Sequence, residues 1–340
     1  MTTSKQTDPF ALVGTTLAGK YDVEAVVEQT DLSVVYRAVH RVVQRPVAIK
    51  AFKAPRRSEA RGRELVEGFV REGALLMELS ERSAAVCQAR DVAAFTTERG
   101  EAIPYIVLEW LDGEPLEAML QRERAQGAAV RTIQEAMGLL APVAEALSLA
   151  HERRIVHRDV KPSNVFVVAE GHRCKLIDFG IAKLVDEISR AESLGTFTPA
   201  YGAPEQFSPD HGTVGPWTDV YALALVLVEL LAGREALGSH DVLRLARNSC
   251  DPGRRPTPRT IGAHVSRAVE GVFLRALALR PEHRFANARE FWAALTAAVA
   301  LRMPVVPPEL DATIPIDLRR MRRRNAPRPF ARVLEFLRTA

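Results

Sequence analysis

The sequence is poor in cysteine. Only three cysteines occur in 340 residues, and they are widely separated at Cys87, Cys174 and Cys250. An odd and scattered set forms neither a disulfide framework nor a cluster of metal ligands. The chain is therefore not a small disulfide-stabilised domain, and a reducing cytoplasm is the expected compartment.

The sequence also lacks a long apolar run. Residues 1–10 are polar and contain no apolar segment typical of a secretory signal. The longest apolar stretch, residues 220–231, contains Glu229. It is also shorter than the roughly 20 residues that cross a bilayer. We therefore expect no secretory signal and no transmembrane segment.

Most of the chain lacks a net positive charge. The net charge is +4, but residues 302–340 hold nine arginines against four acidic residues, so the other 301 residues are close to −1. The main body thus offers no electrostatic reason to bind nucleic acid. The tail is rich in proline and arginine, with a predicted short amphipathic helix over residues 330–337. Three interpretations of it remain open: contact with an acidic partner or a membrane surface, packing on the rest of this chain, or a solvated linker.

Against these absences, one stretch is dense in reactive side chains. Residues 157–164 place Asp159, Lys161 and Asn164 within six residues. An aspartate can accept a proton, a lysine can neutralise an anion, and an asparagine oxygen can bind a hard cation. A second acid, Asp178, follows fourteen residues after Asn164 and begins an Asp-Phe-Gly turn. This arrangement suits chemistry on a metal-bound phosphate.

Together these motifs resemble those of the eukaryotic-type serine/threonine protein kinases, including their bacterial members. The resemblance implies an α+β, two-lobed protein kinase fold, with a small β-rich N-lobe carrying one helix and a larger, mainly helical C-lobe. We expect a disordered leader over residues 1–16, a kinase domain over residues 17–301 and the basic tail over residues 302–340. Within the kinase domain, the N-lobe would cover residues 17–111 and the C-lobe residues 112–301.

The patterning of apolar residues agrees with that outline. Stretches rich in β-branched residues predict strands at residues 21–29, 34–39, 45–53, 86–95 and 103–109. Helical spacing of apolar residues predicts helices at residues 58–79, 133–147, 216–232, 266–279 and 288–300. We expect Pro142 to bend the second of these helices.

The resemblance also implies catalytic roles. Asp159 matches the base that accepts the proton of the substrate hydroxyl, and Lys161 matches the residue that steadies the transferred phosphoryl group. Asn164 and Asp178 match the two magnesium ligands. ATP and Mg2+ are the implied cofactors, and proteins, this chain among them, are the implied substrates.

Nucleotide-binding positions follow from the same resemblance. Lys50 matches the lysine that holds the ATP phosphates, and Glu72 matches its ion-pair partner. Leu108 matches the gatekeeper, and the backbones of Glu109 and Leu111 would hydrogen-bond adenine. The other positions expected at the nucleotide are Val27, Glu28, Thr30, Ser33, Val35, Ala48 and Phe166.

The segment from the Asp-Phe-Gly turn to residue 205 is expected to control activity. Thr198 matches the threonine that bonds the catalytic aspartate and lysine in serine/threonine-specific members. Ser193 and Thr196 are the expected sites of autophosphorylation, with Arg158 expected to receive the phosphate. Three further residues match structural positions of the family: Asp219, Glu205 and Arg284.

The chain departs from the family at the phosphate-covering loop. Glu28, Thr30 and Ser33 occupy the positions of the three glycines in the pattern G-x-G-x-x-G-x-V. Glycine lets backbone amides approach phosphates closely, and Glu28 adds a negative charge near them. We therefore expect either weakened ATP binding, which restored glycines would strengthen, or phosphate held mainly through Lys50 and magnesium. The alternative to an active kinase is a pseudokinase scaffold. The complete set of catalytic positions favours activity, and residues 198–205, which resemble a peptide-seating segment, disfavour a small-molecule phosphotransferase.

Overall fold

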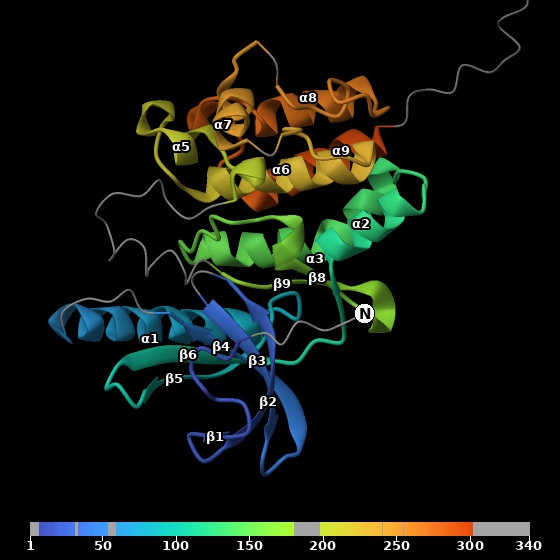
Figure 1. Cartoon of the computed structure of the whole chain (residues 1–340). Helices are drawn as coiled ribbons and strands as arrows, with labels where there is room; N and C mark the ends of the chain where they lie inside the picture. The colour runs from blue at the N-terminus through green and yellow to red at the C-terminus, as the bar shows by residue number, and fades with distance from the viewer. Residues whose placement is uncertain are drawn as a thin grey trace, which may run out of the picture. The chain divides into compact units, whose positions relative to one another are not determined.

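The computed structural model describes residues 7–30, 33–53, 59–179, 198–239, 241–253 and 255–301 (Figure 1). A strand-rich lobe comes first in the chain and a helical lobe follows it. Ser193, Thr196 and the whole tail over residues 302–340 lie outside the described residues, as does the side chain of Glu72. None of the helices in the described ranges is long and apolar enough to cross a bilayer.

The N-lobe is built on a six-stranded antiparallel sheet. Its strands, in spatial order, are β1 (Thr16–Leu17), β2 (Tyr21–Gln29), β3 (Ser33–His40), β4 (Arg45–Phe52), β6 (Ala102–Glu109) and β5 (Ala89–Thr96). Side chains alternate between faces, so the register puts Val35 and Lys50 on one face and Tyr36 and Ile49 on the other. The second face is buried in its own hydrophobic cluster, which leaves the face with Lys50 to meet the C-lobe.

Helix α1 (Glu59–Arg82) packs closely against the edge strand β5. Phe69 and Leu79 are buried on its inner side. Gly73 permits the close approach, because a Cβ added there would lie 2.6 Å from Cγ2 of Val92 on β5. A larger residue at this position would push the helix and the strand apart.

The expectation of a disordered leader over residues 1–16 is wrong for residues 7–16. The hydroxyl of Tyr36 donates to Asp8 at 2.7 Å, and Leu12 is buried in the cluster on the outer face of the sheet. That apolar face needs a cover, and this segment supplies it. The polar composition of the first ten residues concealed this role. Residues 1–6 lie outside the described ranges.

The C-lobe is mainly helical and carries one small sheet. Its helices are α2 (Leu116–Ala125), α3 (Ile133–Glu152), α5 (Pro204–Phe207), α6 (Pro216–Ala232), α7 (Val242–Cys250), α8 (Arg267–Ala276) and α9 (Ala288–Ala300). The sheet consists of β7 (Gly113–Pro115), β8 (Val165–Val168) and β9 (Cys174–Leu176). Helix α3 begins at a capping box formed by Thr132 and Glu135, and it continues through Pro142.

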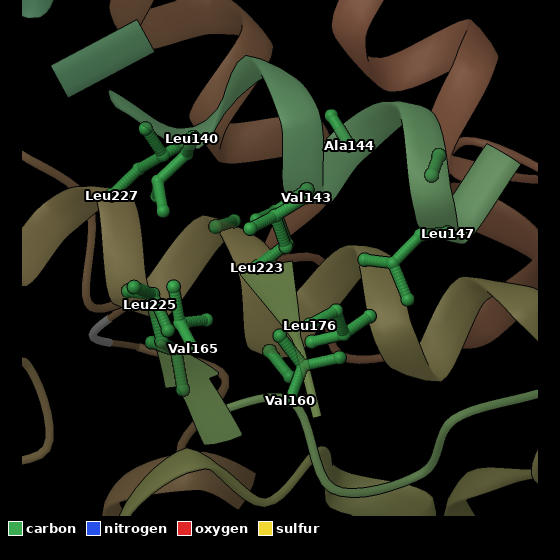
Figure 2. Close-up of a cluster of buried hydrophobic side chains, with 14 of the residues drawn as sticks. Leu140, Val143, Ala144, Leu147, Val160, Val165, Leu176, Leu223, Leu225 and Leu227 are labelled. Carbon is green, nitrogen blue, oxygen red and sulfur yellow. The ribbon is translucent and has the colours of Figure 1, made fainter. Parts of the chain in front are cut away.

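Helix α6 is the centre of the C-lobe. It is buried along nearly its whole length and ends at Gly233, which adopts the left-handed conformation with φ of +68°. Figure 2 shows Leu223 and Leu227 of this helix facing Leu140 and Val143 of α3, with Val160 below them. Because Val160 directly follows Asp159, the same core that joins these helices also anchors the stretch of residues 157–164.

Candidate active site

A buried residue anchors the stretch over residues 157–164 to the core of the C-lobe. Val160 is 1% exposed in the core of the C-lobe. The side chains on either side of it, Asp159 and Lys161, are 23% and 21% exposed. Burial of one residue thus holds two flanking side chains at the surface of the lobe.

A buried carboxylate holds the backbone of this loop. Asp219 on α6 accepts hydrogen bonds from the backbone N–H groups of His157 at 2.8 Å and Arg158 at 2.7 Å. The Nε2 of His151 lies 2.8 Å from the same carboxylate, while its Nδ1 accepts from the backbone N–H of Ala288 at 3.1 Å. The neutral tautomer of His151 with its proton on Nε2 satisfies both contacts.

The pKa of Asp219 reflects these contacts. Burial acts to raise the pKa, but the hydrogen bonds from the His151 ring and from the backbone of His157 outweigh it, so the pKa lies below its ordinary value. The carboxylate is therefore ionised at neutral pH and accepts from every donor around it.

Asp159 is held by three neighbours. The Nζ of Lys161 lies 2.9 Å from its Oδ2, and the Nδ2 of Asn164 donates to the same atom at 3.0 Å. The backbone N–H of Thr198 donates to Oδ1 at 3.2 Å, and Lys161 also donates to the Thr198 hydroxyl. The structure thus brings together the four residues that the sequence analysis had grouped by resemblance. Both oxygens of one carboxylate are fixed in direction.

Lys50 and Asp178 form an ion pair between the lobes. The Nζ of Lys50 lies 2.6 Å from Oδ1 of Asp178, and the side chains are 13% and 34% exposed. Asp178 has a left-handed backbone with φ of +59°, a conformation that carries strain in a residue with a Cβ. The next residue, Phe179, is buried against the ring of His157 at a centroid distance of 4.8 Å. Packing of Phe179 thus supports the turn that presents Asp178.

The donor set fits a hard divalent cation. The Nδ2 of Asn164 is engaged by the carbonyl and the carboxylate of Asp159, at 2.8 and 3.0 Å. This contact turns the amide oxygen of Asn164 away from Asp159. An amide oxygen and the carboxylate of Asp178 are the oxygen ligands that Mg2+ prefers. These residues could therefore hold the metal that the resemblance implies.

Residues expected to contact adenine lie on two sides of the connector. Val35 pairs with Lys50, and Ala48 pairs with Leu108, so these four residues share one face of the N-lobe sheet. Phe166 lies on β8 in the C-lobe, where it pairs with Pro115 of β7. The residues expected at the adenine thus come from one face of the N-lobe sheet and from the small sheet of the C-lobe.

The connector itself is braced by a carboxylate. Glu109 forms an ion pair with Lys175 of β9 and accepts from the backbone N–H of Gln88 at 2.8 Å. Leu111 follows two residues later, before Gly113, whose φ of +150° brings the chain against β8 where a Cβ would overlap the backbone. The side chain of Glu109 is thus engaged in joining the lobes, which leaves backbone groups as the polar features available to a ligand.

The phosphate-covering loop is tied to itself. The N–H of Thr30 donates to the backbone oxygen of Ser33 at 2.9 Å, and the N–H of Ser33 donates to the Thr30 hydroxyl at 3.1 Å. The Nζ of Lys53 donates to the Thr30 carbonyl. Val27 and Glu28 precede this turn at a bulge in the pairing of β2 with β3 and are exposed. The amide of Ser33 is therefore already hydrogen-bonded where the family pattern has a glycine.

Comparison with known proteins identifies the family and the fold. The protein kinase domain family matches residues 21–289, most of the chain. The chain belongs to the protein kinase family. The solved kinase domain of PknI from Mycobacterium tuberculosis superimposes with a TM-score of 0.59 at 26% identity, covering 84% of this chain and 98% of that one. The two-lobed kinase fold expected from the sequence is confirmed.

This chain matches two bacterial proteins among its relatives. It is 39% identical over 215 residues to the serine/threonine-protein kinase Pkn1 of Myxococcus xanthus, covering 62% of this chain and 29% of that protein. It is 28% identical over 296 residues to the serine/threonine-protein kinase PknA of Mycobacterium tuberculosis, covering 87% of this chain and 65% of that protein. This kinase therefore spans less than two thirds of the length of either relative.

Two buried carboxylates hold the end of the segment that runs from the Asp-Phe-Gly turn to residue 205, which we call the activation segment. Glu205 pairs with Arg284 through two contacts of 2.8 Å, and both side chains are fully buried. Tyr201 donates to Glu229, which also pairs with Arg124 of α2. Burial, reinforced by the charge of Glu229, raises the pKa of Tyr201. Tyr201 therefore remains a neutral hydrogen-bond donor.

Several residues of this kinase that position the site were missed by the sequence analysis. Each acts across a long sequence separation, and no local pattern marks them. Gln206 is the nearest to a recognised motif, because it directly follows Glu205. The missed residues are His151, Lys175, Gln206, Arg124, Tyr201 and Glu229.

Proposed function

We propose that this chain is a serine/threonine protein kinase that transfers the γ-phosphate of ATP to serine and threonine hydroxyls of proteins. The observation that supports this most strongly is the fixed carboxylate of Asp159, held by Lys161, Asn164 and Thr198. A base for proton transfer has to be aimed, and three contacts from two segments of the chain aim it.

The proposed mechanism divides the work among these residues. Asp159 accepts the proton of the acceptor hydroxyl, and Lys161 neutralises charge on the transferred phosphoryl group. Lys50 exchanges its partner Asp178 for the ATP phosphates. Asn164 and Asp178 would hold Mg2+, which supplies charge neutralisation at the phosphates when bound.

The rival proposal is a pseudokinase scaffold, and the self-bonded Thr30–Ser33 turn is the observation that favours it. Purified full chain incubated with labelled ATP and magnesium decides between them, with Asp159→Asn as the control. Transfer to itself or to a generic protein acceptor, lost in the variant, supports the enzyme. A folded wild type that transfers no phosphate supports the scaffold.

Regulation by autophosphorylation forms part of the proposal. Ser193 and Thr196 are the acceptors we expect, and Arg158 is the cation that would bind the phosphate. Mass spectrometry before and after phosphatase treatment, with activity followed in parallel, tests this. Full activity in a Ser193→Ala, Thr196→Ala double variant without segment phosphate would refute it.

The proposal also covers the cellular compartment and the binding partner of the tail. Three free thiols, two of them buried, fit a reducing cytoplasm. The basic tail over residues 302–340 is proposed to contact an acidic partner or an anionic membrane surface. Removal of the tail should then weaken binding to anionic vesicles in a salt-dependent way.

A further inference from the structure

Gln206 links the catalytic loop to the end of the activation segment. Its Nε2 donates to the backbone oxygen of Arg158 at 2.9 Å, and its Oε1 accepts from the backbone N–H of Ala203 at 3.1 Å. The oxygen of the amide faces a donor and the nitrogen faces an acceptor, so the amide has one favourable orientation. A single side chain thus connects backbone groups from two segments that are distant in sequence.

Arg158 is a strained position in the catalytic loop. Its φ of +65° lies in the left-handed region, which residues with a Cβ adopt only when their surroundings hold them there. Asp219 holds its N–H at 2.7 Å, and Gln206 holds its carbonyl. Both backbone polar groups of this one residue are therefore bonded by side chains from the C-lobe.

The carbonyl that Gln206 holds belongs to the peptide bond between Arg158 and Asp159. The orientation of that peptide plane sets the direction in which the Asp159 side chain leaves the backbone. The carboxylate of Asp159 is also bonded by the N–H of Thr198, in the same segment that Gln206 contacts at Ala203. Gln206 thus acts on both segments that define where Asp159 points.

We propose that Gln206 is a positioning residue for the chemical step. It holds the peptide bond before Asp159 in its strained orientation and couples that orientation to the placement of the activation segment. Nucleotide contacts come from Lys50 and the connector, so Gln206 affects phosphoryl transfer and leaves ATP binding unchanged. This inference rests on the proposed kinase function.

The test compares three variants of the full chain. Gln206→Glu keeps an acceptor toward Ala203 but replaces the donor toward Arg158 with an oxygen. Gln206→Met keeps the length of the side chain and loses both hydrogen bonds. Gln134→Glu, on the exposed side of α3, is the matched control for the change of charge. Single-turnover transfer from ATP to casein measures the chemical step separately from product release.

We expect both Gln206 variants to lower the single-turnover rate about tenfold, because small misplacements of a base have large effects on rate. The KM for ATP should stay within about twofold of the wild-type value. The control should match the wild type in both.

Three results would overturn the inference. The first is a wild-type single-turnover rate in both Gln206 variants, and the second is a lower rate in Gln206→Met but not in Gln206→Glu. The third is a lower rate that comes with a higher KM for ATP and a lower unfolding temperature. Absence of transfer by the wild type would refute the proposed function instead.

Discussion

The Nζ of Lys50 lies 2.6 Å from Oδ1 of Asp178, so the cation proposed to hold the ATP phosphates is paired with the acid proposed to hold magnesium. The pair joins β4 of the N-lobe to the turn after β9 of the C-lobe. Binding of Mg-ATP would replace this single contact with two, Lys50 to phosphate and Asp178 to metal. Each of the two groups would keep a partner of opposite charge in this exchange, so neither would be left as an uncompensated charge.

Replacement of Lys50 tests this exchange. Lys50→Met should lower phosphoryl transfer at least about a hundredfold, because it removes an electrostatic contact that stabilises phosphate charge. Asp178 is one third exposed, so stability should change by less than about 1 kcal/mol. Lys20→Met, which removes a surface pair with Asp91, is the matched control. A transfer assay and urea unfolding measure both effects, and retained transfer in Lys50→Met would contradict the assignment.

The Thr30–Ser33 turn gives a second prediction. Thr30→Gly removes the hydroxyl that now accepts from the Ser33 amide, which frees that amide for phosphate. The KM for ATP should fall about threefold, the worth of one modest hydrogen bond.

Thr97→Gly is a close control for that change. Thr97 also accepts a backbone N–H, from Glu101, in a hairpin turn of the N-lobe. It should weaken its own turn and leave the KM unchanged. An unchanged or raised KM in Thr30→Gly would mean that the loop binds phosphate in its present geometry.

The close approach of Gly73 to Val92 predicts a loss of stability and activity that a second substitution can reverse. Gly73→Ala places a Cβ 2.6 Å from Cγ2 of Val92, which should lower stability by roughly 1–3 kcal/mol and displace α1. Activity should fall too, because α1 carries Glu72. Val92→Ala in the same chain should restore both.

Gly138→Ala on α3 provides the control, since nothing lies within 4 Å of its added Cβ. It should be neutral or slightly stabilising. Thermal unfolding and the transfer assay check the set, and a double variant no better than Gly73→Ala would refute the steric explanation.

The elements that the sequence predicted best are those with long, uninterrupted patterns. Strand β2 and helices α6 and α9 begin and end at the predicted residues. Strands β7 and β9 have three residues each, too few to show alternation, and the helices α2 and α7 were missed among charged residues. A periodic spacing of apolar residues can be recognised only over several turns or alternations, so short elements that tertiary contacts hold in place leave little pattern in the sequence.

The residues of the candidate site also fall into two groups, those that a linear motif indicates and those that only the fold brings together. Linear motifs singled out Asp159, Lys161, Asn164 and Asp178 as site residues, because each lies in a short pattern with fixed spacing. The contact from Gln206 to Arg158 spans 48 residues and depends on where α5 packs. No composition or spacing encodes such a contact, so only the folded chain reveals it.

The buried carboxylate of Asp219 gives the last prediction. Asp219→Asn keeps one acceptor oxygen but sets an NH2 group against one of the N–H donors of residues 157 and 158. The variant should lose about 3 kcal/mol of stability at pH 7 and transfer phosphate more slowly, since an unsatisfied donor is left beside the strained loop.

The pH dependence of that loss follows from the pKa of Asp219, which lies below its ordinary value because His151 and His157 outweigh the effect of burial. An acid whose pKa is lowered by folding stabilises the native state above the unfolded pKa, near 4, and loses this effect as pH falls further. The difference in unfolding free energy between wild type and Asp219→Asn should therefore be constant from pH 7 to 5 and shrink below about pH 4. Asp241→Asn, at an exposed helix N-cap where asparagine serves equally well, is the control and should show no loss. Urea unfolding across this range measures the difference, and a gap that widens on acidification would show that Asp219 is protonated in the native state.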